Sequence, residues 1–222
     1  METPLITGAT GFLGRDVVHE LLGRDAQVQI VCLIRARDEA ELQRRRQRVV
    51  DGLPAAQADR VTALRGDIEL PRLGLDEATY AGLPERLGRV IHIAASTNFD
   101  HTLEEARRIN VGGTEHALQL ARELRARGRL GRLDYVGTAY VAGDRTDLAR
   151  EDELDAGQGF RNTYEQSKFE AEKRAQTKPR PVGPRQTGRG IGATIEGWSG
   201  WLPARPTERT TTPNWGRRTR WR

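Results

Sequence analysis

The segment Thr7–Gly14 (TGATGFLG) constrains the fold more than any other part of this chain, because glycine fills three of its eight positions. It follows a short apolar strand predicted at Pro4–Thr7 and leads into an amphipathic helix predicted at Leu13–Leu22. Glycines at this spacing between a strand and a helix are typical of a loop that binds the pyrophosphate of a dinucleotide. The helix then turns its free N–H groups and positive dipole end toward the phosphates. We expect such a ligand to contact Gly8, Thr10, Gly11, Phe12, Leu13 and Gly14.

The rest of residues 1–172 alternates between strand and helix patterns, which predicts a parallel sheet covered on both faces. Further strands are predicted at Val28–Ile34, Val61–Arg65, Arg89–Ile93 and Leu133–Gly137. Further helices are predicted at Glu39–Val50, Glu77–Glu85 and Leu103–Arg127, and a last one begins near Tyr164. The expected fold is a doubly wound α/β Rossmann domain over residues 1–172, with strand order 3-2-1-4-5.

The composition changes at Lys173. Residues 173–222 hold twelve basic and two acidic side chains, a balance of +10, and all four tryptophans. The whole chain carries +5, so residues 1–172 carry −5 and the basic character belongs to the tail. Apart from a short strand at Ile191–Ile195, we expect this tail to be irregular and disordered. Nucleic-acid binding through Arg and Trp is one interpretation. The one that we favour is a sequence not under selection, as after a reading-frame shift.

Other features exclude several classes of protein. The single cysteine, Cys32, lies in a predicted buried strand, so we expect a core residue in a reducing cytoplasm and no internal disulfide. No apolar run approaches 18 residues, which predicts no membrane span. No metal site is predicted.

The second predicted strand ends in Arg35 and Arg37, at the position where an NAD-binding site usually has an acidic residue for the ribose 2′-hydroxyl. Two arginines would instead bind the 2′-phosphate of NADP. The sequence therefore favours NADPH as the cofactor. Asp67 and Ile68 follow the third strand and are predicted to lie beside the adenine. A turn-forming role is the alternative for Asp67.

Small residues follow the fourth strand. Ala94, Ala95 and Ser96 would let the cofactor lie against the backbone. His92, inside that strand, is predicted to be a packed histidine rather than a catalytic one.

Tyr164 and Lys168 are four residues apart on a predicted helix, so their side chains share one face. A neighbouring ammonium group favours phenolate and can lower the pKa of a tyrosine by about 1–3 units. Tyr164 would then work as a general acid or base. Thr138 follows the fifth strand, at the sheet edge where ligands bind. Its hydroxyl could hydrogen-bond a substrate carbonyl, or could only satisfy its own backbone.

Four motifs in order, TGATGFLG, INVGGT, GTAYVAG and NTYEQSK, resemble the extended short-chain dehydrogenase/reductase superfamily. The sequence of these motifs is most similar to that of the male-sterility or thioester-reductase branch, which includes fatty acyl-CoA reductases. The resemblance covers residues 3–172 and implies NADPH-dependent reduction of a thioester or carbonyl. It implies that Thr138, Tyr164 and Lys168 form a catalytic triad and that Asn110 helps to order the site. It also implies that Tyr164 and Lys168 contact the cofactor, with Lys168 on its ribose. Gly137 stands where many relatives have serine.

Nothing after Lys173 matches the strands and substrate lobe that follow in this family, so we expect that lobe to be missing and activity to be in question. The implied substrate is an acyl thioester on coenzyme A or a carrier protein, or another carbonyl compound. A homodimer is expected by analogy. Two alternatives stay open: an enzyme like the sugar-nucleotide epimerases and dehydratases, and a non-catalytic NADP-binding fragment.

Overall fold

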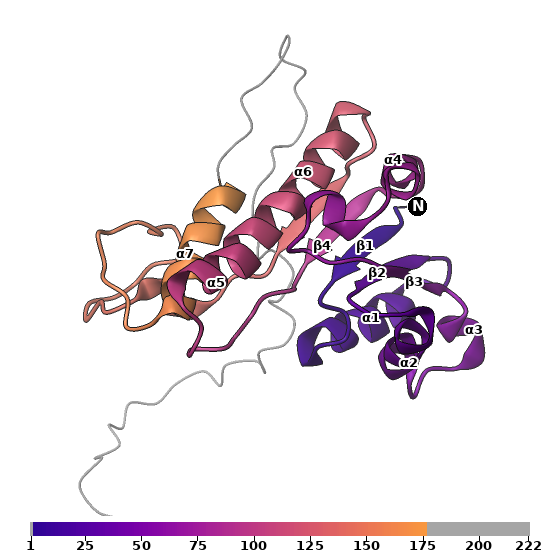
Figure 1. The fold of residues 1–222 in the computed structure, drawn as a ribbon, viewed down its shortest axis with the longest axis horizontal. Coiled ribbons are helices and arrows are strands. Elements are labelled where there is room, and N and C mark those ends of the chain that lie inside the picture. Colours follow the sequence, from indigo (N-terminus) through magenta and orange to yellow (C-terminus); the bar gives the residue numbers. More distant parts are fainter. Residues whose placement is uncertain (1, 177–222) are drawn as a thin grey trace, which may run out of the picture.

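A computed structural model describes residues 2–176, which form one parallel sheet flanked by helices (Figure 1). The strands are β1 (Pro4–Thr7), β2 (Ile30–Ile34), β3 (Val61–Arg65), β4 (Arg89–His92) and β5 (Arg132–Tyr135). The α-helices are α1 (Phe12–Arg24), α2 (Glu39–Val50), α3 (Ala55–Ala58), α4 (Glu77–Arg86), α5 (Leu103–Ala106), α6 (Gly113–Ala126) and α7 (Thr163–Gln176). The shorter turns are η1 (Pro71–Gly74), η2 (Arg107–Gly112) and η3 (Ala139–Ala142). The strand order is β3-β2-β1-β4-β5, all parallel, which confirms the predicted doubly wound fold.

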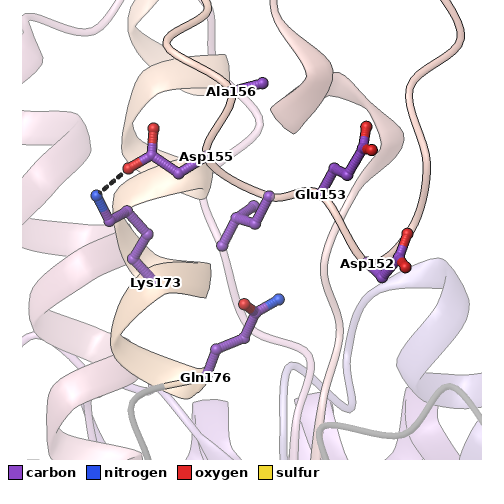
Figure 2. A pocket seen from close by; sticks show the side chains of 7 residues that line it. Asp152, Glu153, Asp155, Ala156, Lys173 and Gln176 are labelled. Atoms are coloured by element: carbon purple, nitrogen blue, oxygen red, sulfur yellow. Dashed lines mark hydrogen bonds and ion pairs between the residues drawn. The ribbon is translucent and has the colours of Figure 1, made fainter.

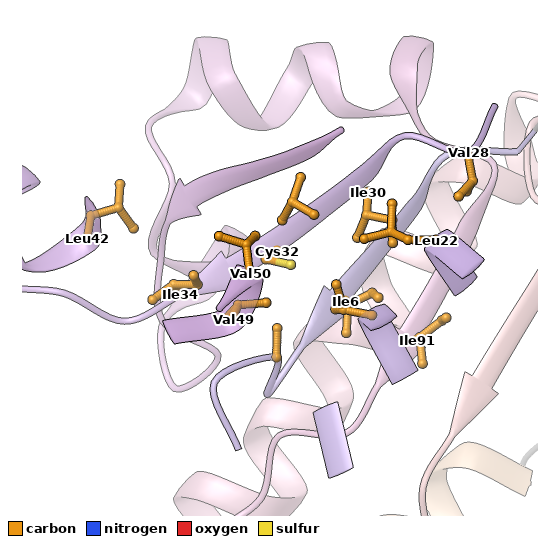
Figure 3. Close-up of a cluster of buried hydrophobic side chains, with 13 residues drawn as sticks. Ile6, Leu22, Val28, Ile30, Cys32, Ile34, Leu42, Val49, Val50 and Ile91 are labelled. Carbon is orange, nitrogen blue, oxygen red and sulfur yellow. The ribbon is translucent and has the colours of Figure 1, made fainter. Parts of the chain in front are cut away.

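Neighbouring residues of β1, β2 and β4 belong to two separate hydrophobic clusters, because successive side chains point to opposite faces of a sheet. Ile6 joins a cluster with α1 and α2, drawn in Figure 3 together with Cys32 and Ile91. Leu5 joins the second cluster, with α4 and α6. Hydrophobic side chains therefore cover both faces of the sheet at these strands, as the continuous apolar runs predict. The thiol of Cys32 is buried, and its pKa is raised to about 12 by that burial.

The helices begin at side chains that accept hydrogen bonds from free backbone N–H groups. Asp38 accepts from the N–H of Glu41 at the start of α2, and Asp76 accepts from Thr79 at the start of α4. Asn162 accepts from the N–H of Glu165 in the first turn of α7. These caps explain why α2 and α4 start where the sequence predicts.

The predicted single helix Leu103–Arg127 is interrupted by a π-helical turn. Thr102 forms a reciprocal capping box with Glu105, and η2 then separates α5 from α6. A π turn admits one extra residue and re-aims the side chains around it, often at functional sites. Here it carries Asn110, which is buried, and Arg108, which faces solvent.

Strand β5 pairs only with β4 within the described part of the chain. Asp134, in the middle of this strand, pairs with Arg89 on β4 and with Arg132. Charged side chains protect a strand edge from further pairing. No helix among residues 2–176 is long and apolar enough to cross a membrane.

Helix α7 runs through Gln176, four residues beyond the predicted end of the domain at 172. The remainder of the predicted tail, with the strand at Ile191–Ile195, lies outside the described residues.

Candidate active site

The glycine-rich loop closes tightly between β1 and α1. Gly8 has φ of +76°, and a Cβ there would lie 2.7 Å from the backbone nitrogen of Ala94. Gly14 packs on the loop, since a Cβ there would collide with the carbonyl oxygen of Gly8. At Gly11 the space is open: a Cβ would meet only the Gly8 carbonyl oxygen, at 3.4 Å. Adding a side chain would therefore disrupt the turn at two of these glycines and fill open space at the third.

The first residues of α1 surround this open space. No side chain caps the helix at Gly11, so its first N–H groups are available to an anion. Thr10 and Phe12 are exposed, and Leu13 is half-buried. This arrangement fits a pyrophosphate group, because the backbone at Gly11 carries no side chain and lies at the positive end of α1.

A buried asparagine connects the end of β4 to helix α7. The side-chain oxygen of Asn110 accepts from the backbone N–H of Ser96 (2.8 Å), and its amide donates to the carbonyl of Ser96 (3.2 Å). The same amide donates to the hydroxyl of Ser167 (2.9 Å), which in turn donates to the carbonyl of Tyr164 (3.0 Å). Since Ala94 lies against Gly8, a continuous path of contacts leads from the glycine loop to the Tyr164 helix.

His92 extends this network beneath the site. Its two ring nitrogens lie 2.8 Å from the hydroxyl of Thr7 and 3.2 Å from that of Thr114. Burial lowers the pKa of His92 to about 3, with the charge of Lys168 acting in the same direction. His92 is therefore a neutral, packed histidine, as predicted.

Tyr164 and Lys168 lie on the buried face of α7. The ring of Tyr164 packs edge-on against Phe99 (centroids 5.4 Å apart) and Tyr140 (6.3 Å). The Nζ of Lys168 donates to the carbonyl of Val136 (2.8 Å) and lies 4.6 Å from the ring centroid of Tyr135. Lys168 therefore reaches the end of β5, whereas Tyr164 packs against one residue that follows β4 and one in η3.

Burial lowers the pKa of Lys168 to about 8, and the carboxylate of Glu172 opposes this shift. Glu172 is one helical turn further along α7, and burial raises its own pKa. Its carboxylate reaches the backbone of Gly137, where an added Cβ would meet Oε2 at 2.6 Å. Glu172 was not among the predicted site residues, although its i+4 spacing from Lys168 is a local signal for it.

Thr138 begins the turn η3 and lies partly exposed just beyond β5. Its hydroxyl accepts a hydrogen bond from the backbone N–H of Tyr140 at 3.3 Å. Tyr140 packs on Tyr164. Thr138 is therefore two positions in the sequence before a residue that contacts Tyr164.

The two arginines predicted to share one phosphate contact different carboxylates. Arg37 pairs with Glu41 at the start of α2 (3.0 Å), and this contact contributes to lowering the pKa of Glu41 to about 2. Arg35 pairs with Glu69 at 2.9 Å. Arg108, from η2, also pairs with Glu69, and sequence reasoning missed it because its partner lies on a distant segment.

The turn after β3 is built by Asp67 and Ile68. The carboxylate of Asp67 accepts from the backbone N–H of Glu69 (2.9 Å), so it does form a turn. The carbonyl of Ile68 accepts from the ring of His116 at 2.7 Å, and its side chain fills the space above Gly113.

Four exposed apolar side chains lie on segments that follow strands. Phe12 follows β1, Leu70 follows β3, Phe99 follows β4 and Tyr140 follows β5. Ligands of open parallel sheets bind outside the carboxyl ends of the strands. These four residues lie on segments that follow strands, whereas the exposed Leu148 lies on the loop after η3.

A separate hollow lies near the far end of α7 (Figure 2). It is lined by residues 152–156 together with Lys173 and Gln176, and Lys173 pairs with Asp155 at 2.6 Å. Since Lys173 is nine residues beyond Tyr164 on the helix, the hollow is not part of the site described above.

The fold and the glycine loop define a nucleotide-binding α/β domain of the extended short-chain dehydrogenase/reductase class. The chain belongs to the Male sterility protein family, an NAD-binding family whose sequence model matches residues 6–183.

Individual relatives agree with this assignment. The chain is 36% identical over 141 residues to nonribosomal peptide synthetase asaC of Aspergillus flavus, covering 62% of this chain and 13% of the relative. It is 32% identical over 174 residues to fatty acyl-CoA reductase 1 of Arabidopsis thaliana, covering 71% and 35%. Among solved structures it resembles the terminal R domain from the myxalamid PKS-NRPS pathway, with TM-score 0.69, 37% identity and coverage of 78% and 44%.

A dTDP-glucose 4,6-dehydratase from Bacillus anthracis, solved with NAD, shares the fold alone: 20% identity and TM-score 0.55, covering 79% of this chain and 49% of that one. The chain spans less than half the length of each of these proteins.

Proposed function

We propose that this chain reduces an acyl thioester, carried on coenzyme A or on a carrier protein, with NADPH as the reductant. The observation that carries the proposal is the contact path from Gly8 through Ala94, Ser96 and Asn110 to Ser167. This path joins the glycine loop to α7, the helix of Tyr164 and Lys168, by close packing and hydrogen bonds, which supports a single site. Membership of an NAD-binding family with thioester-linked relatives supports the same activity.

The cofactor would be held by the glycine loop, by residues 94–96, by Asp67 and Ile68 beside the adenine, and by Lys168. Arg35 supports NADPH over NADH, because a guanidinium binds a phosphate with charge-assisted hydrogen bonds. When bound, the reduced nicotinamide supplies a hydride to an acyl carbon.

The chain's own residues would handle the proton and the oxygen. The hydroxyl of Thr138 donates to the carbonyl oxygen, and Tyr164 gives its proton to that oxygen as negative charge develops. The product is a hemithioacetal, whose loss of a thiol leaves an aldehyde. Lys168, kept charged by Glu172, favours the phenolate that remains on Tyr164.

The experiment is an assay of the full chain with NADPH and octanoyl-CoA, which follows nicotinamide absorbance and identifies aldehyde or alcohol by chromatography. Tyr164→Phe should reduce the rate on the order of 10²–10⁴-fold, as expected for a lost general acid, with NADPH affinity unchanged. An aldehyde product indicates one two-electron step, and an alcohol indicates two.

Other outcomes would contradict the proposal. NADPH binding without turnover of CoA or pantetheine thioesters would identify a non-catalytic binding module. NAD that copurifies in stoichiometric amounts would favour the epimerase or dehydratase alternative.

A further inference from the structure

One carboxylate lies between two guanidinium groups beside the ends of β2 and β3. Oε1 of Glu69 accepts from Nη1 of Arg35 at 2.9 Å, and Oε2 accepts from Nε of Arg108 at 3.0 Å. The side chain of Glu69 is 16% exposed, against 67% for Arg35 and 59% for Arg108. The two arginines therefore converge on a largely buried anion from opposite segments of the chain.

The position of Glu69 is fixed by the turn that carries it. Its backbone N–H donates to the carboxylate of Asp67, which also lies 3.9 Å from Nη1 of Arg35. Arg35 thus faces two carboxylates. These carboxylates hold the guanidinium of Arg35 in place. Their negative charge also offsets much of its attraction for an incoming anion.

We propose that Glu69 is an internal substitute for the 2′-phosphate of NADPH and determines cofactor preference, and that Arg108 is the second guanidinium for that phosphate. The inference rests on the proposed function, since it assigns the 2′-phosphate to this corner. A phosphate carries about −1.5 to −2 charges and three acceptor oxygens, so it can replace the single carboxylate of Glu69 as the partner of both arginines. Competition by Glu69 nevertheless weakens binding, because its ion pairs with the two exposed arginines must break first.

The test measures binding rather than turnover. Calorimetric titration of the full chain uses 2′,5′-ADP and 5′-AMP, two probes that differ only in the 2′-phosphate. Glu69→Gln keeps the shape of the side chain and removes its charge. Breaking two ion pairs whose guanidinium groups are exposed corresponds to roughly a three- to tenfold change in affinity, so Glu69→Gln should raise the affinity for 2′,5′-ADP by that factor. The affinity for 5′-AMP should change less than about twofold, since surface charges outside the contact contribute little.

Two variants separate this role from a structural one. Arg108→Gln should lower the affinity for 2′,5′-ADP relative to 5′-AMP, whereas a loop that merely loosens would weaken both probes equally. The matched control is Glu115→Gln, whose carboxylate pairs with Arg122 on the exposed face of α6. It should leave both affinities unchanged.

Each outcome decides the matter. If the ratio of 2′,5′-ADP affinity to 5′-AMP affinity in Glu69→Gln equals or falls below that of the wild type, the proposed role of Glu69 is overturned. Binding of NADPH by the wild type would in that case leave the proposed function intact. If Glu69→Gln fails to fold, Glu69→Ala and the ratio in Arg108→Gln decide in the same way. If neither wild type nor variants bind NADPH, the proposed function fails and this inference fails with it.

Discussion

The two halves of the candidate site are built by different physical means. Around Gly8 and Gly14 the loop depends on the absence of side chains, because backbone atoms occupy the space that a Cβ would need. Around Asn110 and Lys168 the frame depends on polar side chains that are buried and bonded to one another or to the backbone. The first region should be damaged by adding atoms, and the second by removing them or by changing their charge.

The largest expected effect tests the first region. Gly14→Ala places a methyl group against the Gly8 carbonyl and 2.8 Å from the Cα of Ala9, so it should lower the free energy of unfolding by about 3 kcal/mol. It should also abolish NADPH binding. Urea unfolding of the full chain measures the first effect and calorimetry the second.

Gly23→Ala is the matched control, because Gly23 lies in the same helix with nothing within 4 Å of an added Cβ. Alanine there should stabilise the chain by about 0.5–1 kcal/mol through helix propensity. Equal effects of the two substitutions would show that close packing at Gly14 does not shape the loop.

The next effect tests the second region by deletion. Asn110→Ala removes the side-chain partner of the Ser96 N–H and carbonyl and one of the two hydrogen bonds of the Ser167 hydroxyl, so we expect a loss of about 2 kcal/mol, since unpaired buried polar groups cost about 1–3 kcal/mol. The measurement is urea unfolding. Asn98→Ala, on the exposed loop, should change stability by less than about 0.5 kcal/mol. A small effect at both positions would contradict the bridging role of Asn110.

Sequence reasoning succeeded where the signal is local. The sequence predicts the bounds of β1, β3 and α2 as the structure has them, and the expected Rossmann fold has the strand order that the structure shows. It failed where a distant partner decides the geometry. The π turn at Asn110 and the pairing of Arg108 with Glu69 require contacts between segments far apart in the chain, which no local pattern encodes.

A pH titration tests the charge in the second region. The pKa of Lys168 falls from about 10.5 in the unfolded chain to about 8 in the fold, so the unfolded chain holds more protons between these values. Stability from this group is therefore fully present above pH 10.5 and lost as the pH falls through 8. The difference in free energy of unfolding between wild type and Lys168→Met should rise from pH 8 to pH 10.5. A difference that is flat over this range would show that Lys168 is not desolvated.

The smallest expected effect is at the contact between β5 and α7. Gly137→Ala brings a methyl group within 2.6 Å of Oε2 of Glu172, but this atom ends a flexible side chain and can move away. We expect a loss of less than about 1 kcal/mol in urea unfolding, at the low end for overpacking, in contrast to Gly14→Ala where backbone blocks relaxation. If Glu172 moves away, its carboxylate stabilises the charged form of Lys168 less, so the pKa of Lys168 should fall further. In the thioester assay this variant should lose activity at a lower pH than the wild type as the solution becomes alkaline. An unchanged profile together with unchanged stability would mean that Glu172 does not hold Lys168 in its charged form, and that the charge depends on the Val136 carbonyl and the Tyr135 ring instead.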